Sequence, residues 1–428
     1  MSEKDGEARK RSIAAAVSTR TDSGAGYDRL PVDERIERLA RLIVDFGANV
    51  QPGQVVVVGA EIGHEELVRA IAVFAYERGA KFVDANYYDP YVKHARVARV
   101  EDASLEFIPS WFGERVLELG RLRGATISLA GPSAPKLFDD LDPARLGRDT
   151  YPRVKEWTHV INDSSVNWCV APCPTAGWAE LVHPDVEPAQ ALDLLWDELA
   201  HICRLDEPNP ADAWRDRSAT LMSVAQKLTE RRFDALQFEG DGTDLYVGLL
   251  PTSRWAGGGD VTAGGIPYMP NIPTEEVFTA PDPERTHGSV RATMPLTVYG
   301  ATIEGLRMRF DRGRAVEIDA DRGAETIRAY ASRDENARRL GEVAIVDREG
   351  RVGSSGTVFY DTLLDENAAS HVALGDAYEA SVADEDRDRV NRSELHLDFM
   401  IGGTDVDVTG ITRNGGRVPV LVGGRWQI

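Results

Sequence analysis

Two residues near the C-terminus could bind a transition metal. The segment SELHLDFMIGG (393–403) predicts a β-strand and places His396 and Asp398 two residues apart. Side chains alternate between the two faces of a strand, so both would point to the same side. An imidazole and a carboxylate on one face make half of a metal site. The simpler alternative is a surface ion pair.

The preceding segment, LLDENAASHVALGDAY (363–378), carries His371 and Tyr378. Their spacing of seven residues fits two turns of a helix, which would place both side chains on one stripe. An ordinary polar stripe on a helix is the alternative.

Acids occur in two further segments. NIPTEEVFTAPD (271–282) predicts a strand bracketed by prolines, in which Glu275 and Glu276 point to opposite faces, so that only one can enter a shared site. RRLGEVAIVD (338–347) places Glu342 just after Gly341, where a helix is expected to give way to a strand. Taken alone, each segment is better explained as an exposed edge strand or as a solvated acid at a strand end.

Taken together, two of these acids, the two histidines and Asp398 form a five-ligand set for two zinc, cobalt or manganese ions. Two such ions can activate a water molecule and hold a tetrahedral intermediate, and Tyr378 could stabilise its oxyanion. The spacing alone therefore indicates a dinuclear metal hydrolase.

Alternating elements precede these segments. Strands are predicted at 54–59, 81–85, 125–131 and 166–172, with helices at 36–46, 64–78 and 111–120 between them. This alternation is typical of an α/β domain with a mostly parallel sheet and helices on both faces, here 31–205. The run QVVVVG reads as a strand buried on both faces. No glycine-rich fingerprint follows it, which disfavours a nucleotide cofactor.

Helices are predicted at 188–205 and 210–232, and the stretch 206–232 would bridge to a second domain. From residue 233 to 428 short strands follow one another, separated by turns such as Asp311-Arg312-Gly313. We therefore expect a β-rich α+β catalytic domain there. Residues 1–30 combine low hydrophobicity with no cleavage-site pattern and predict a disordered tail.

Composition limits the partners. The net charge of −21 argues against nucleic acids and anionic membranes, and no apolar run is long enough to span a bilayer. The three cysteines, Cys169, Cys173 and Cys203, predict idle thiols in a reducing cytoplasm.

The four segments quoted above resemble the motif blocks of the M29 peptidases, the family of aminopeptidases T, S and II. The similarity also includes NVQPGQVVVV, FDALQFEGDGTDLYVGL and GTDVDVTG, and it runs in order over about residues 33–428. Several blocks in order are far more specific than one short motif. The resemblance implies a metallo-aminopeptidase with two divalent ions, an N-terminal α/β domain and a C-terminal catalytic domain. It also implies a homodimer that encloses the active sites, with peptides bearing a free N-terminus as substrates.

Residue by residue, the resemblance implies as ligands Glu342, His371, His396, Asp398 and one glutamate of the PTEEVF block. Block spacing favours Glu276 over Glu275. Tyr378 matches the family's catalytic tyrosine.

Glu366, five residues before His371, is a candidate general base or an anchor for the substrate amine, with capping of a helix start as the alternative. Other functions also fit the ligand set: a different dinuclear amidohydrolase, a carboxypeptidase, or a non-catalytic relative that binds metal or peptide.

Overall fold

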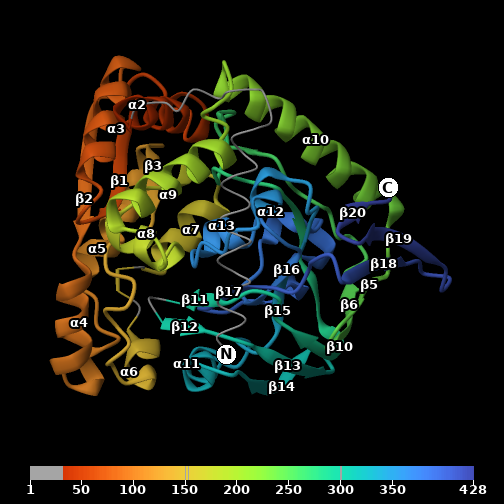
Figure 1. Cartoon of the computed structure of the whole chain (residues 1–428). Coiled ribbons are helices and arrows are strands. Elements are labelled where there is room, and N and C mark those ends of the chain that lie inside the picture. The colour runs from red at the N-terminus through yellow and green to blue at the C-terminus, as the bar shows by residue number, and fades with distance from the viewer. Residues whose placement is uncertain (1–31, 150, 153, 299–300) are drawn as a thin grey trace.

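The computed structural model describes residues 32–149, 151–152, 154–298 and 301–428 (Figure 1). The tail predicted at 1–30 lies outside the described residues. Helices and a parallel sheet make up the N-terminal part, and strands dominate the C-terminal part, as the sequence predicts. No helix in the described ranges is both long enough and apolar enough to cross a bilayer.

The N-terminal sheet is parallel and has the strand order β2-β1-β3-β4. Its strands are β1 (Val55–Glu61), β2 (Phe82–Tyr88), β3 (Ala125–Ala130) and β4 (Asn167–Pro172). Its helices are α2 (Val32–Leu42), α3 (Glu65–Glu77), α4 (Pro90–Arg99), α5 (Ser110–Arg121), α6 (Pro143–Arg148), α7 (Glu156–Asn162), α8 (Ala176–Val182) and α9 (Pro188–Ile202). A short π-helical turn, Ile43–Gly47, continues α2.

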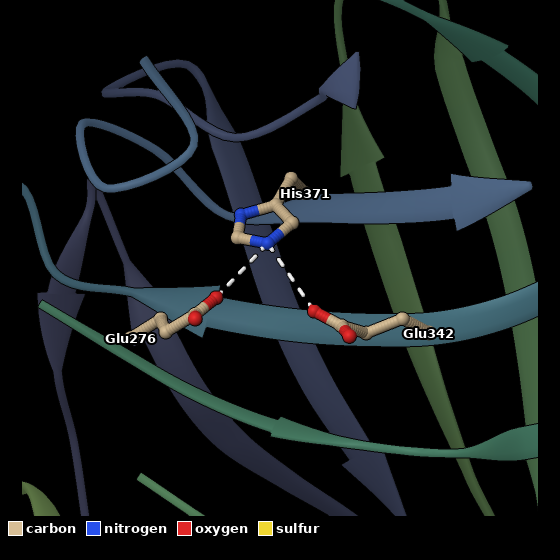
Figure 2. Close-up of side chains that lie close together, drawn as sticks. All are labelled: Glu276, Glu342 and His371. Atoms are coloured by element: carbon tan, nitrogen blue, oxygen red, sulfur yellow. Dashed lines mark ion pairs between the residues drawn. The ribbon is translucent and has the colours of Figure 1, made fainter. Parts of the chain in front are cut away.

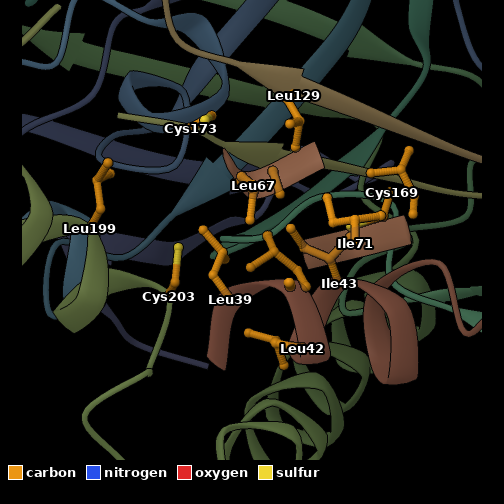
Figure 3. Packing of buried hydrophobic residues seen from close by; sticks show 14 of the residues in the cluster. Leu39, Leu42, Ile43, Leu67, Ile71, Leu129, Cys169, Cys173, Leu199 and Cys203 are labelled. Carbon is orange, nitrogen blue, oxygen red and sulfur yellow. The ribbon is translucent and has the colours of Figure 1, made fainter. Parts of the chain in front are cut away.

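Helices cover both faces of this sheet. On one face Val56 and Val58 join the core formed by α2, α3 and α9, which includes Leu39, Leu67 and Leu199 (Figure 3). On the other face Val55 and Val57 pack against residues of α5 and α7. The residues of β1 alternate between buried and half-buried, so the expectation of complete burial on both faces is only half met. The second core is small and leaves that face partly open.

The helix α10 (Pro210–Arg231) connects the two parts. The side chain of Asn209 accepts a hydrogen bond from the amide of Asp212 and thereby caps the first turn of α10. Trp214 on α10 belongs to the N-terminal core, whereas Leu221 and Leu228 belong to the C-terminal core. The domain limits 31–205, 206–232 and 233–428 stay predictions.

The C-terminal part is built on an eight-stranded sheet with the order β14-β13-β10-β6-β5-β18-β19-β20. Its strands are β5 (Ala235–Gly240), β6 (Thr243–Leu249), β10 (Pro281–Arg291), β13 (Arg307–Asp311), β14 (Arg314–Asp319), β18 (Val406–Ile411), β19 (Arg417–Val422) and β20 (Arg425–Trp426). Two small hairpins pair β7 (Asp260–Val261) with β8 (Pro267–Tyr268) and β11 (Leu296–Val298) with β12 (Ala301–Ile303). The remaining helices are α11 (Ala324–Tyr330), α12 (Arg351–Ser355) and α13 (Thr362–Asp365).

A separate antiparallel sheet, ordered β17-β16-β15-β9, carries the residues of interest. Its strands are β9 (Glu276–Thr279), β15 (Leu340–Val346), β16 (His371–Gly375) and β17 (His396–Met400). The helix expected from His371 to Tyr378 is wrong, because His371–Gly375 is a fully buried strand hydrogen-bonded on both sides. Glu342 lies inside β15, not at its start, and no helix directly precedes that strand.

Candidate metal centre

Strand pairing brings the predicted ligands to one face of the four-stranded sheet. Glu342, Ala373 and Asp398 lie opposite one another across β15, β16 and β17. His371 lies opposite Ala344, two residues further along β15. Directly opposed residues in an antiparallel sheet share a face, and so do residues two apart on one strand. His396 therefore joins Asp398 on this face, as the sequence predicts.

The other face of the same sheet is apolar and fixes it on the C-terminal core. Val343, Val372, Leu397 and Phe399 all belong to that core. Each ligand-bearing strand is thus held by the hydrophobic residues that alternate with its polar ones. Between the ligands, Ala373 has only a methyl group and leaves room for the longer acidic side chains.

His371, Glu276 and Glu342 form the tightest group (Figure 2). Nε2 of His371 lies 3.0 Å from Oε2 of Glu276 and 3.5 Å from Oε1 of Glu342. All three residues are buried, and the candidate ligand atoms lie within 4.8 Å of one another. The expectations of an exposed acid in the first glutamate segment and a solvated acid at Glu342 are therefore wrong.

A second group shares Glu342 with the first. Nε2 of His396 lies 3.5 Å from Oδ2 of Asp398 and 3.9 Å from Oε2 of Glu342. The two oxygens of Glu342 consequently face different histidines. Asp398 is buried and His396 is only partly exposed, so the expectation of a surface ion pair is wrong.

Backbone carbonyls hold both imidazoles with Nε2 turned toward the acids. Nδ1 of His371 is 3.2 Å from the carbonyl oxygen of Ala369, and Nδ1 of His396 is 2.8 Å from that of Asp376. A proton on each Nδ1 satisfies these contacts and leaves the Nε2 lone pair available to a metal. This arrangement is the usual one for metal-binding histidines.

The close packing of acids and histidines in this group shifts their pKa values. Burial alone would lower the pKa of His396, but Asp398 and Glu342 raise it to about 10. Burial likewise opposes protonation of His371, and the carboxylates of Glu276 and Glu342 raise its pKa well above the ordinary value. Burial raises the pKa of Glu342 despite the nearby His371. A compensating positive charge is therefore strongly favoured here.

The donor set fits divalent transition metals. Within the described residues, Oδ1 of Asp398 is buried and has no hydrogen-bond partner, and the buried Oε2 of Glu276 faces Nε2 of His371 without hydrogen-bond geometry. Buried carboxylate oxygens without partners are costly unless a cation takes their lone pairs. Mixed imidazole and carboxylate ligands suit zinc, cobalt and manganese. These residues would hold such ions without rearrangement of the sheet.

Two further predicted residues border the group. Tyr378 follows β16 and is 37% exposed, and its ring packs beside Phe278 and His396 with centroid distances of 5.6 and 5.7 Å. Glu366 ends α13 instead of starting a helix, so capping of a helix start is wrong. Burial raises the pKa of Glu366 well above its usual value, and the charges of Asp398 and Glu276 add to this.

Glu275 does not join the group. Its carboxylate is completely buried and pairs with Arg204 and Arg217. These two arginines, together with the carbonyls that fix the histidines, were missed at the sequence level. Nothing in the local pattern points to them, because they approach from the end of α9 and from α10.

Comparisons with known proteins identify the family of this chain. A model of the family described as thermophilic metalloprotease (M29) matches residues 32–426. The chain belongs to the M29 family. Aminopeptidase T of Thermus aquaticus is 39% identical over 404 residues, covering 92% of this chain and 99% of that protein. Aminopeptidase 2 of Geobacillus stearothermophilus is 35% identical over 405 residues, with coverages of 92% and 98%.

A solved structure extends the M29 assignment to the fold. Wild-type AmpT from Thermus thermophilus matches with a TM-score of 0.84 at 37% identity, covering 93% of this chain and 100% of that one. The family predicted from the motif blocks is thereby confirmed, together with the combination of a parallel sheet and a strand-rich C-terminal part. As a member of a metalloprotease family, the chain is a metal-dependent peptide hydrolase.

Proposed function

We propose that this M29 protein is an aminopeptidase that removes N-terminal residues from peptides with two divalent ions per chain. The observation that carries the proposal is the position of Glu342, whose two carboxylate oxygens face His371 and His396 respectively. A carboxylate in this position would be able to contribute to the binding of both ions. The names of the relatives, aminopeptidase T and aminopeptidase 2, support the choice of substrate.

In this proposal Glu276, Glu342 and His371 would hold one ion, and Glu342, His396 and Asp398 would hold the other. The proximity of Glu276 to His371 supports Glu276 over Glu275 as the first ligand. Zinc, cobalt and manganese all suit these donors. Such ions, when bound, lower the pKa of water and polarise a carbonyl group.

Tyr378 and Glu366 supply the remaining chemistry. Tyr378 lies beside His396 and is partly exposed, so it can donate a hydrogen bond to the oxyanion of the tetrahedral intermediate. Glu366 is a buried carboxyl whose pKa is raised by burial and by the charges of Asp398 and Glu276. It acts either as the general base or as the anchor of the substrate's α-amine, and both roles require a carboxylate close to the ligands.

A homodimer and a cytoplasmic location belong to the same proposal. Apolar residues are exposed along the edge strand β2 and the neighbouring α4 and α5, among them Phe82, Tyr91 and Trp111. An exposed apolar surface of this kind supports burial against a second copy. The cysteines Cys169, Cys173 and Cys203 are free and buried, which supports a reducing compartment.

The deciding experiment compares leucine- and arginine-p-nitroanilide with their N-acetylated forms, using purified protein before and after chelation. We expect hydrolysis of the free-amine substrates only, loss of activity with chelator, and recovery with added zinc, cobalt or manganese. Equal cleavage of the acetylated substrates would indicate another amidohydrolase, and cleavage from the C-terminus of a peptide would indicate a carboxypeptidase. Two bound ions without any hydrolysis would point to a non-catalytic relative.

A further inference from the structure

A group of four charged residues lies next to the candidate ligand Glu276: the buried acids Glu275 and Asp347 and the partly buried arginines Arg204 and Arg217. Oε1 of Glu275 is 2.9 Å from Nη2 of Arg204, and Oε2 is 2.5 Å from Nε of Arg217. Nη2 of Arg217 also lies 3.2 Å from Oδ2 of Asp347. Two acids and two arginines balance in charge. We call these four residues the charge cluster.

The two arginines come from the connection between the two parts of the chain. Arg204 follows α9 with a left-handed backbone conformation, φ +60°, and its guanidinium lies 4.7 Å from the ring centroid of Trp214. Arg217 is on α10. Arg204 thus comes from the end of α9 and Arg217 from α10, and each contributes a charge to a site that is built by other elements.

One acid of the charge cluster is next to Glu276 in the chain, and the other is next to the residue that pairs with Glu276 in the sheet. Glu275 precedes it in the chain, and Asp347 follows Val346, the residue opposite Glu276 on β15. Trp426 donates a hydrogen bond of 2.8 Å from Nε1 to Oδ2 of Asp347 and fixes that carboxylate.

A third connection runs to the segment before β16. The amide of Glu275 donates a 2.6 Å hydrogen bond to Oδ1 of Asn367, which directly follows Glu366. The side chain of Asn367 in turn donates to the carbonyl of Leu363 on α13. The charge cluster therefore joins α10 to β9, to β15 and to the turn that leads into His371.

Stability alone does not account for these charges. Burying ions costs so much solvation free energy that well-packed apolar residues are often equally stable in their place. The backbone of Gly350 approaches this carboxylate closely, because a Cβ atom added at Gly350 would lie 3.1 Å from Oε2 of Glu275. The hydrogen bonds from Arg204 to Glu275 and from Arg217 to Asp347 are directional and are suited to hold these side chains and their neighbours in one geometry.

We propose that Glu275, Arg204 and Arg217 are positioning residues, which orient the carboxylate of Glu276 toward His371 and thereby set the affinity for the ion on that side. The inference rests on the proposed two-ion site. It also makes metal affinity depend on the seating of α10 against the sheet. Surface charges remote from the charge cluster have no such effect.

The test measures metal binding, not activity alone. Metal-free Glu275→Gln is titrated with Co²⁺ in competition with a chromophoric chelator, and the visible absorption of bound cobalt is recorded. Removing a residue that orients a metal ligand typically costs 10- to 100-fold in affinity. We expect a loss of this size for one of the two ions, an altered cobalt spectrum, and unchanged affinity for the other ion. Arg217→Gln should give the same pattern.

Arg35→Gln is the matched control. The buried Arg35 forms an ion pair of 2.7 Å with the partly buried Asp197 in the N-terminal part, outside the charge cluster. This variant should lose stability in urea and keep both metal affinities. If Glu275→Gln does not fold, the double variant Glu275→Gln/Arg217→Gln, which removes one negative and one positive charge and so keeps the charge cluster balanced, takes its place in the titration.

Folded variants with wild-type affinity for both ions and an unchanged cobalt spectrum would overturn the positioning role. A wild-type protein that binds no cobalt would instead overturn the proposed two-ion site itself. The two failures are therefore distinguishable within one set of titrations.

Discussion

The ring of Tyr378 meets the imidazole of His396 edge-on, with 5.7 Å between the centroids. The tyrosine thus borders the ligand group without belonging to the five ligand positions. We expect Tyr378→Phe to bind both ions normally and to lower kcat by roughly 10²–10³, the usual cost of one lost oxyanion donor. Steady-state kinetics with parallel metal analysis measures both quantities. Full activity in this variant would reject the assignment.

His396 should be needed for one ion only. His396→Ala removes the imidazole that faces Asp398 and Glu342, while His371 and Glu276 keep their contacts. We expect the number of tightly bound ions to fall from two to one per chain and activity to be lost. Metal analysis after gel filtration measures this number.

His287→Ala provides the control for this variant. His287 is exposed on β10 and its ring stacks on Tyr246, with centroids 4.4 Å apart. It should retain two ions and full activity. Two ions retained in His396→Ala would contradict the assignment of this ligand.

Glu366→Gln separates the two roles proposed for this residue. If Glu366 is the general base, the substitution should lower kcat by roughly 10²–10⁴ and change KM little. As an amine anchor, its loss would raise KM and narrow the difference between free and N-acetylated substrates. Kinetics with both substrate forms distinguishes the two patterns. Unchanged kinetics would remove Glu366 from the mechanism.

Lys93 gives the N-terminal part a pH-dependent stability. Only 2% exposed, it donates a 2.6 Å hydrogen bond from Nζ to the carbonyl of Tyr151. Burial lowers its pKa to about 8, although nearby Asp149 opposes the shift. The unfolded lysine has a pKa of about 10.4, so the unfolded chain binds more protons between these two values. The free energy of unfolding therefore increases as the pH rises through that range. Below pH 8 the buried, charged Lys93 destabilises the fold to the full extent.

Lys93→Met removes this titration. Between pH 7 and pH 10.5, the free energy of unfolding of the wild type should rise by roughly 3 kcal/mol more than that of the variant. Urea unfolding at several pH values measures the difference, with exposed Lys81→Met as the control. Parallel curves for Lys93→Met and wild type would show that Lys93 does not titrate in this range.

The sequence by itself determined what depends on local periodicity. His396 and Asp398 share a face because side chains in any strand alternate with a period of two. The parallel sheet followed from strands that alternate with helices, and the family followed from the order of several motif blocks.

Only the tertiary structure decided the rest. The residues from His371 to Tyr378 fit a helical spacing, yet His371–Gly375 is a strand because β15 and β17 pair with it on both sides. Pairing across strands likewise turned Glu276 toward His371, while Glu275 pairs with Arg204, which follows α9, and with Arg217 on α10. Such contacts join segments far apart in the chain, so the sequence near each residue carries no signal of them.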